Sequence, residues 1–548
     1  MASPSFSTEG TIRPPLCAAA PVLRSLLPLA GGILAARYPH ALHLVPILLL
    51  AAVFTFRGPR RLIPASFLTG FILAFSQTPR PHPSWENRPP REVQVSLEIT
   101  ETFNARKPGR LAGIGRVRES RLPLDTLRGH EVAFYLATLP DADTPARGHH
   151  VTCSGLLTHL PFLEELDDYQ AYLTNRAVFL SLNQGRITAH LRSPPFLERL
   201  RQRLHEASAG MLRSGTREPG DPGNVLASML LGERSFLTDD RIQLYRETGT
   251  YHLFAVSGLH VGSFALCLFG ILALARLPRT LAVFPVLAGT WIYIWLTGAS
   301  PSAIRAGIMI SCLSLSRSLS RQPHPFPALA LSAWIVLLRQ PSQLFHLGFQ
   351  LSYSVVGAIL LLGLPAAAAF RNHLNSRAGH LLFQRGPGRR ILQGTSRLFD
   401  LVAVSLSASL VSMPLIIQHF NLFTPAGVFF GILLNPLVTF IVMLGTLCLL
   451  AAPLLGTLLP GTLAVMSWPA ITFVEFILKT SLRIPHAVSE RAWSWPPAGT
   501  VLVLLTLLLA WILQRGRMTG ARLPVALSLL PHGLILTALS LFLQQTDS

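Results

Sequence analysis

Long apolar stretches recur along this chain, and they restrict its fold more than any other feature. Half of the 548 residues are hydrophobic, only 13% are charged, and the mean hydropathy is +0.45. An ordinary soluble domain has about 25% charged residues. Because a run of about 20 apolar residues crosses the ~30 Å hydrocarbon core of a bilayer, the sequence predicts a mainly α-helical, polytopic membrane protein with roughly ten spans.

Two apolar blocks flank a polar region, which divides the chain into four expected parts. These are N-terminal transmembrane helices, a β domain, amphipathic helices and a C-terminal transmembrane domain, at 1–76, 77–192, 193–249 and 250–548. In the first part, spans are expected near 21–36, 41–56 and 62–75. In the last part, they are expected near 252–275, 281–298, 302–316, 326–338, 343–363, 400–420, 425–452, 455–481, 498–514 and 523–543.

Apolar and polar residues alternate in several short stretches of the polar region. The alternating apolar residues are Val93, Val95, Leu97 and Ile99, and later Val132, Phe134 and Leu136. A period of two residues is typical of half-buried strands. Further strands are expected at 151–157, 177–182 and 186–189. Together these stretches predict a small β-barrel of about five strands.

The next region, 193–249, predicts three short helices. In the first, Leu197, Leu200, Leu204, Ala207 and Met211 recur at helical spacing opposite Arg199, Arg203 and Glu206. Such an amphipathic helix lies on a membrane face or against a helical bundle. The second begins after Pro222, and the third begins at the N-cap Thr238 and ends at Gly249.

The positive charges indicate one orientation in the membrane. The net charge of +20 comes almost entirely from arginine, and arginines gather on alternate loops, as expected for cytoplasmic loops. Arg57, Arg60 and Arg61 mark one such loop, and six arginines between 371 and 397 mark another. Counting spans from these loops predicts a cytoplasmic N-terminus and an extracytoplasmic β domain. Because this rule explains much of the charge, +20 alone does not indicate nucleic-acid binding.

Several polar residues lie within the apolar segments, where they are costly unless they face the bundle interior or a wet path. The densest group is His252, Ser257, Gly258 and His260. If this run is helical, Ser257 and His260 share one face, and Gly258 permits a kink. Helix packing with internally satisfied polar groups is the alternative interpretation. The other candidates are Arg305, Gln350, His419, Asn435 beside Pro436, and Glu475.

Ser257 and His260 also raise the possibility of an intramembrane serine hydrolase. The pattern G-x-S-x-G is absent around Ser257, because Ala255 takes the first glycine position. Nucleophile and base normally come from different elements of a fold rather than from one helical turn. We therefore expect no catalytic residue, and the sequence contains no metal-binding motif and no sign of a cofactor.

These groups, in this order, resemble the ComEC family of competence proteins. The similar stretches are Leu230-Leu-Gly-Glu-Arg234, Gly249-Thr-Tyr-His252-Leu-Phe-Ala-Val-Ser257-Gly-Leu-His260-Val, Arg305-Ala-Gly-Ile-Met309, Gly348-Phe-Gln350-Leu-Ser352, and Pro414 through Phe420 with Asn435-Pro436. The segment Asp168-Tyr-Gln-Ala-Tyr-Leu173 resembles the end of the family's OB-like domain. Many relatives continue into a metallo-β-lactamase-like domain. This chain has no H-x-H-x-D-H motif, so we expect no nuclease activity of its own.

The resemblance implies a channel in the bacterial cytoplasmic (inner) membrane that takes up single-stranded DNA during natural transformation. The OB-like domain would guide the strand outside the membrane, and the C-terminal helices would pass it through. Candidate residues along the DNA path are His252, Ser257, His260, Arg305, Gln350 and Asn435. A separate nuclease and a cytoplasmic ATP-driven translocase are the implied partners besides DNA and the bilayer. An exporter of another solute or a lipid remains an alternative.

Overall fold

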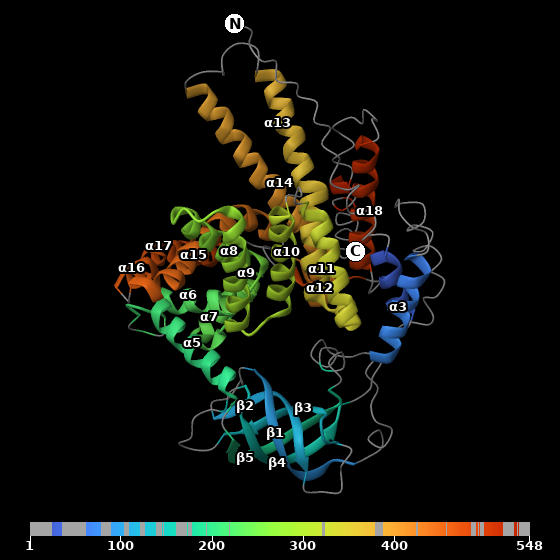
Figure 1. Ribbon diagram of the computed structural model, residues 1–548, viewed down its shortest axis with the longest axis vertical. Coiled ribbons are helices and arrows are strands. Elements are labelled where there is room, and N and C mark those ends of the chain that lie inside the picture. Colours follow the sequence, from blue (N-terminus) through green and yellow to red (C-terminus); the bar gives the residue numbers. More distant parts are fainter. Residues whose placement is uncertain are drawn as a thin grey trace.

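The protein is mainly helical, with a small β-barrel at one end (Figure 1), which confirms the predicted fold class. Its architecture comes from a computed structural model. The structure describes residues 25–35, 62–77, 89–103, 109–120, 127–138, 145, 147–160, 173, 178–192, 194–216, 218, 220–319, 324–378, 387–423, 426–455, 458–483, 489–490, 493, 498–518, 531–533, 535 and 537.

The barrel is closed by five strands in the order β1-β2-β3-β5-β4, and β1 pairs with both β2 and β4. All the pairs are antiparallel except β3 with β5. This connectivity is that of an OB-like barrel. The strands are β1 Arg91–Phe103, β2 Arg110–Ser120, β3 Glu131–Ala137, β4 His150–His159 and β5 Leu180–Arg192.

The predicted alternation identifies the interior of the barrel. Val93, Val95, Leu97 and Ile99 of β1 are buried and pack with Val132, Phe134 and Leu136 of β3. The two stretches expected at 177–182 and 186–189 are parts of one strand, β5. The sequence analysis missed β2, because its glycines and arginines conceal the alternation. Gly113 is required there, since a Cβ would lie 2.2 Å from the backbone oxygen of Glu101.

Three helices connect the barrel to the rest of the molecule. They are α5 Phe196–Leu212, α6 Pro222–Leu231 and α7 Asp239–Glu247. The apolar side chains of Phe196, Leu197, Leu200 and Leu204 on α5 are exposed. By contrast, α6 is not amphipathic, because every residue from Gly223 to Leu231 is buried.

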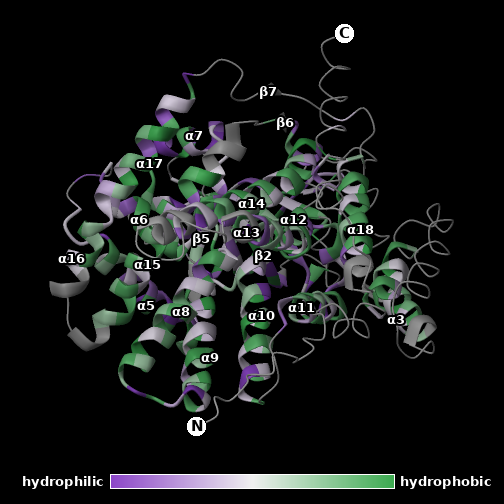
Figure 2. Cartoon of the chain, turned by 90° about the horizontal axis from the view of Figure 1, so that it is seen from above, coloured by the Kyte–Doolittle hydropathy of each residue, from purple (hydrophilic) through white to green (hydrophobic). Residues whose placement is uncertain are grey.

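Long apolar helices make up the remaining described part (Figure 2). They are α3 Leu62–Gln77, α8 Gly258–Leu274, α9 Arg279–Leu296, α10 Pro301–Ser318, α11 Pro325–Arg339, α12 Leu347–Ala358, α13 Leu364–Ala378, α14 Pro387–Phe420, α15 Ala426–Leu455, α16 Leu458–Met466, α17 Trp468–Ser481 and α18 Ala498–Met518. Among the described residues, five helices are long and apolar enough to cross a membrane: Arg279–Leu296, Leu347–Leu374, Gln393–Phe420, Gly431–Ala452 and Gly461–Ser481.

Several spans differ in detail from the predicted ones. The expected span 455–481 is split into α16 and α17 at Ser467. The expected span 343–363 continues much further, because a π-helical turn at Ile359–Gly363 joins α12 to α13 without a break. The expected span 41–56 lies outside the described residues, as does most of 523–543.

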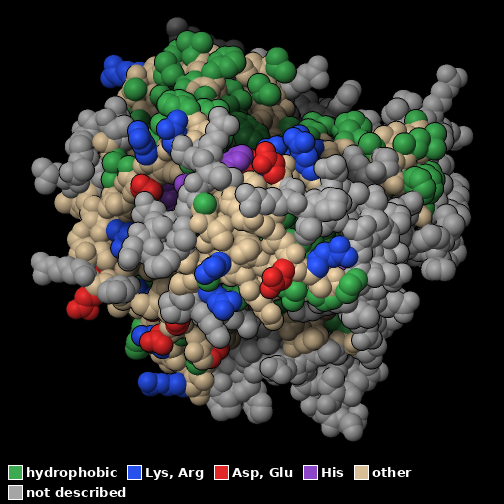
Figure 3. All heavy atoms as spheres, turned by 90° about the horizontal axis from the view of Figure 1, so that it is seen from below, with side chains coloured by type: hydrophobic (Ala, Val, Ile, Leu, Met, Phe, Trp, Pro, Cys, Tyr) green, Lys and Arg blue, Asp and Glu red, His purple; other side chains and the backbone are tan. Residues whose placement is uncertain are grey.

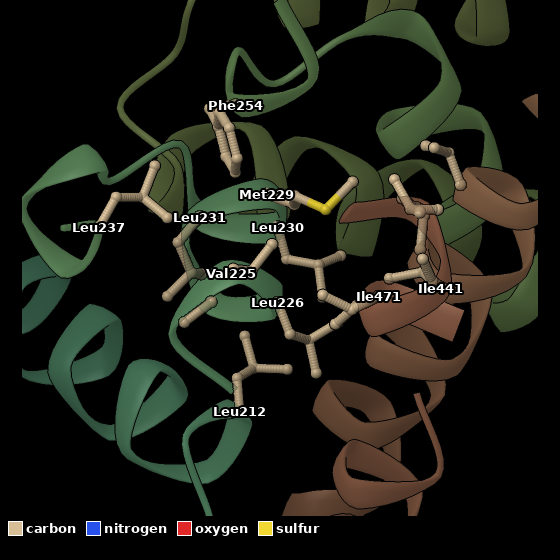
Figure 4. Packing of buried hydrophobic residues seen from close by; sticks show 14 of the residues in the cluster. Leu212, Val225, Leu226, Met229, Leu230, Leu231, Leu237, Phe254, Ile441 and Ile471 are labelled. Carbon is tan, nitrogen blue, oxygen red and sulfur yellow. The ribbon is translucent and has the colours of Figure 1, made fainter. Parts of the chain in front are cut away.

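The largest core cluster surrounds α6 (Figure 4). Leu226 and Leu230 of α6 pack against Ile441 of α15 and Ile471 of α17. Gly445 of α15 allows the close approach, because a Cβ there would lie 2.1 Å from a methyl group of Leu230. The phenolic OH of Tyr293 on α9 donates a 2.7 Å hydrogen bond to the carbonyl of Leu230. Helices from both ends of the C-terminal half thus enclose α6.

Candidate functional site

The run around Ser257 is not one continuous helix. Tyr251–Phe254 forms a 3₁₀ turn, Ala255 is extended, and α8 begins at Gly258 with Ser257 as its N-cap. The expectation of a span starting at 252 is therefore wrong for the first six residues. The physical reason is the Ser-Gly pair, since serine favours the N-cap and releases the chain from helical geometry. His252 lies on the 3₁₀ turn, where it is exposed and its Nδ1 lies 3.1 Å from the carbonyl of Gly249.

Ser257 and His260 are in direct contact. The backbone N–H of Ser257 donates to Nδ1 of His260 at 3.2 Å, and the Ser257 hydroxyl lies 2.9 Å from the same nitrogen. An Nδ1 that accepts these bonds carries no proton, so in the neutral ring the proton is on Nε2. His260 is 1% exposed, and its Nε2 has no hydrogen-bond partner among the described residues. The pair therefore caps α8 and leaves one buried donor.

Arg305 lies one turn inside α10 and is only 4% exposed. Its Nη2 donates to the carbonyl of Gly348 and to the hydroxyl of Ser352, both at 2.7 Å, on the first turns of α12. The guanidinium also lies 5.9 Å from the ring centre of Tyr353. Nε has no partner, and no carboxylate forms an ion pair with Arg305 among the described residues. The positive charge is thus buried without a counter-ion from this part of the chain.

The starts of three helices meet at this place. The hydroxyl of Ser300, the N-cap of α10, donates to the carbonyl of Val256 just before α8, at 3.1 Å. Arg305 then joins α10 to the beginning of α12. Helix N-termini carry partial positive charge from their aligned peptide dipoles. The ends of α8, α10 and α12 and the Arg305 guanidinium therefore make a positively charged region, here called the helix-start site.

The remaining candidates contribute differently. Gln350 of α12 belongs to the helix-start site: its Nε2 donates to the carbonyl of Leu344 at 3.2 Å, and its Oε1 is buried without a partner among the described residues. Asn435 lies on α15, exposed, with its Nδ2 3.5 Å from the Ser405 hydroxyl of α14. The structure thus joins four of the six candidates, Ser257, His260, Arg305 and Gln350, through α8, α10 and α12. His252 is near them in sequence, whereas Asn435 contacts other helices.

Glu475 has a partner that the sequence did not reveal. Its carboxylate forms a buried, two-pronged ion pair with Arg241 of α7, at 2.8 Å and 2.9 Å. Arg241 also donates to the carbonyl of Asp221 at 3.0 Å, just before α6. Burial, together with the nearby carboxylate of Glu475, raises the pKa of the Tyr245 hydroxyl. Glu475 therefore fixes α7 against α17, and no sequence signal links two residues so far apart.

The barrel surface carries its charges in pairs. Arg116 and Glu131 form an ion pair at 3.3 Å, and Arg118 pairs with Glu98. Seen from the barrel end, basic and acidic side chains are interspersed (Figure 3). On the outer face of β2 and β3, Ile114 and Ala133 are buried beneath Leu173 and Val178. OB folds commonly bind oligonucleotides on this face, which here is covered by the chain itself.

Cys153 is the barrel's one cysteine in the sequence, and it is fully buried. Burial raises the pKa of its thiol to about 12. The neutral thiol behaves as a small apolar core residue and is unreactive.

Comparison with known proteins assigns the chain to a family. The family model described as competence protein matches residues 229–518, which include the helix-start site. This chain belongs to the competence protein family. The match confirms the resemblance drawn from the sequence, and it leaves the barrel outside the matched range.

Curated relatives of this competence-family chain are similar over shorter stretches. ComE operon protein 3 of Bacillus subtilis is 30% identical over 227 residues, which is 41% of this chain and 26% of the relative. Recombination protein 2 of Haemophilus influenzae is 28% identical over 144 residues, 25% of this chain and 18% of the relative. The matches thus span about a quarter or less of these relatives' lengths. No solved structure matches.

Proposed function

We propose that this protein passes single-stranded DNA across the bacterial cytoplasmic membrane during natural transformation, and that the helix-start site contacts the strand. The observation that carries the proposal is Arg305, a buried cation with no carboxylate partner among the described residues. Membership of the competence family supports the same function.

A guanidinium in this position favours an anionic ligand. Isolated charges are expensive to bury, so a buried arginine is normally paired with an anion from the protein or from outside it. A phosphodiester oxygen suits this role, because the arginine fork matches phosphate geometry and Nε is free. The buried Nε2–H of His260 and the three helix N-termini add donors and positive potential. A phosphate backbone would thus meet the site at every nucleotide as the strand advances.

The wider arrangement completes the proposal. The N-terminus lies in the cytoplasm, and the barrel lies outside the membrane, where it guides the arriving strand. A separate nuclease supplies the single strand, and a cytoplasmic ATP-driven translocase pulls it. Because the β2–β3 face of the barrel is covered, the strand contacts other parts of the barrel surface.

Uptake of labelled DNA into the cytoplasm tests this function directly. Cells without the gene are compared with cells that produce the wild type, Arg305→Gln, or the matched control Arg279→Gln, an exposed arginine at the start of α9. At equal protein levels, we expect Arg305→Gln to lower cytoplasmic label at least about tenfold, the equivalent of about 1.4 kcal/mol. Arg279→Gln should behave as wild type. Normal uptake in cells without the gene would reject the proposal and favour an exporter.

The contact between Ser257 and His260 supports one alternative, an intramembrane serine hydrolase. The 2.9 Å separation of the hydroxyl and Nδ1 is within the range of a nucleophile and its base. However, Nδ1 already accepts the Ser257 N–H, and no third group orients the ring through Nε2 among the described residues. The contact is that of a helix cap. Labelling of the wild type, but not of Ser257→Ala, by a fluorophosphonate probe would instead establish the hydrolase.

A further inference from the structure

Two helices of this protein are much longer than a bilayer requires. The helix from Leu347 to Ala378 is unbroken, and α14 has 34 residues. At 1.5 Å per residue they are about 48 Å and 51 Å long, against a hydrocarbon core of about 30 Å. A tilt of 20° shortens their span across the membrane by only a few ångströms. One end of each helix must therefore extend beyond the membrane.

The extending ends are α13 and the first half of α14. In Figure 1 both rise beyond the other helices, at the end of the molecule opposite the barrel. The two helices are held together near the bundle, where the rings of Phe370 and Phe399 stack at 3.6 Å and Arg371 pairs with Asp400 at 2.6 Å. We call α13 together with residues 387–400 of α14 the two-helix arm.

The arm is strongly basic. Its helices carry five arginines, at 371, 377, 389, 390 and 397, and one acidic residue, Asp400. Asp400 is already paired with Arg371 at the base of the arm. Arg397 and its neighbour Leu398 are exposed. The remaining excess of positive charge thus has no acidic partner within the arm.

We propose that the two-helix arm is a second binding surface for a single-stranded nucleic acid, on the side of the membrane opposite the barrel. This inference rests on the proposed function. Anionic lipid would be the other polyanion within reach, but surface potentials decay within a Debye length of about 8 Å at physiological ionic strength. An arm that extends roughly 18 Å beyond the hydrocarbon core holds its outer arginines past most of that potential.

The connection to the helix-start site favours DNA further. The unbroken helix begins with Gly348 and Ser352, which bind Arg305, and ends in the arm. One rigid element thus runs from the site that contacts the strand to the basic surface where the strand emerges. Nonspecific binding of single strands commonly uses such positively charged tracks along the backbone.

Site-specific photocrosslinking tests the arm. The full-length protein in detergent carries p-benzoylphenylalanine in place of Leu398, which is 60% exposed, or in place of Leu319, which is 70% exposed at the end of α10 beside Arg317. The probe is a labelled 30-nucleotide oligo(dT). We expect Leu398 to crosslink at least about fivefold more than Leu319. Adding Arg389→Gln and Arg390→Gln should abolish the difference and lower the salt dependence of binding by a slope of about 1.4.

The outcomes separate this inference from the proposed function. Equal crosslinking at both positions, with DNA still bound by the protein, would overturn the arm and leave the proposed function standing. Crosslinking of Leu398 to phospholipid in vesicles of 30% phosphatidylglycerol, with no crosslink to oligo(dT), would assign the arm to the membrane. Absence of any DNA binding by the wild type would count against the proposed function itself.

Discussion

The barrel and the helical part of this protein treat their arginines in opposite ways. In the barrel, Arg116 and Arg118 are about half exposed, and each pairs with a glutamate. In the helical part, Arg241 and Arg305 are buried, and only Arg241 has a carboxylate partner among the described residues. Exposed pairs are weak because water already solvates both charges. Buried charges leave no such freedom, so each must be paired or must serve a ligand.

The comparison distinguishes structural arginines from functional ones. Arg241 is needed to fix α7 against α17, whereas Arg305 gains only two neutral hydrogen bonds for its burial. A mutation series should therefore give large losses of stability at the first, and losses of transport without unfolding at the second.

The largest loss of stability is expected at Glu475. Glu475→Gln keeps the shape of the side chain but leaves Arg241 buried without its counter-ion, which costs about 3–5 kcal/mol. Thermal unfolding of the purified protein in detergent measures the change. An unfolding temperature equal to that of the wild type would show that the pair is solvated, and would remove the contrast with Arg305.

A smaller loss is expected at the start of α8. Ser257→Ala removes the hydroxyl next to His260 and should cost about 1 kcal/mol, typical of a lost helix cap. Ser316→Ala is the control, because its hydroxyl only bonds back to Cys312 within α10. If both variants unfold alike, capping does not explain the Ser257 contact.

Little change is expected on the barrel. Arg118→Ala removes an ion pair whose arginine side chain is 50% exposed, worth about 0–1 kcal/mol. Glu98→Ala should give the same small effect, and the double variant should equal either single one within about 0.5 kcal/mol. Losses that reach those of Glu475→Gln would mean that exposure does not set the value of these pairs.

The smallest loss of stability is expected for Arg305→Met. Replacing a buried, unpaired charge by an apolar side chain of similar length is often neutral or stabilising. The unfolding temperature should match or exceed that of the wild type, while DNA uptake falls. A loss of about 3 kcal/mol or more would instead show that Arg305 mainly holds α10 to α12.

Local patterns predicted much of this architecture, and long-range contacts set the limit. The alternation in β1 and β3 and the apolar helices were readable because each depends on neighbours in sequence. Strand β2 was hidden because Gly113 answers to the backbone of another strand. The helix-start site was readable as separate groups, but the bond between Arg305 and Ser352 was not, since only packing of α10 against α12 creates it. The ion pair of Arg241 with Glu475 lay beyond any local pattern for the same reason.

The enclosure of α6 has a consequence for biogenesis. The ribosome makes this helix long before α15 and α17, which cover its apolar surface. During that interval α6 must be shielded by lipid or by the insertion machinery, because bare apolar surface invites aggregation. Assembly of the C-terminal half is therefore completed only after synthesis has passed α17, and chains truncated before α15 should be degraded.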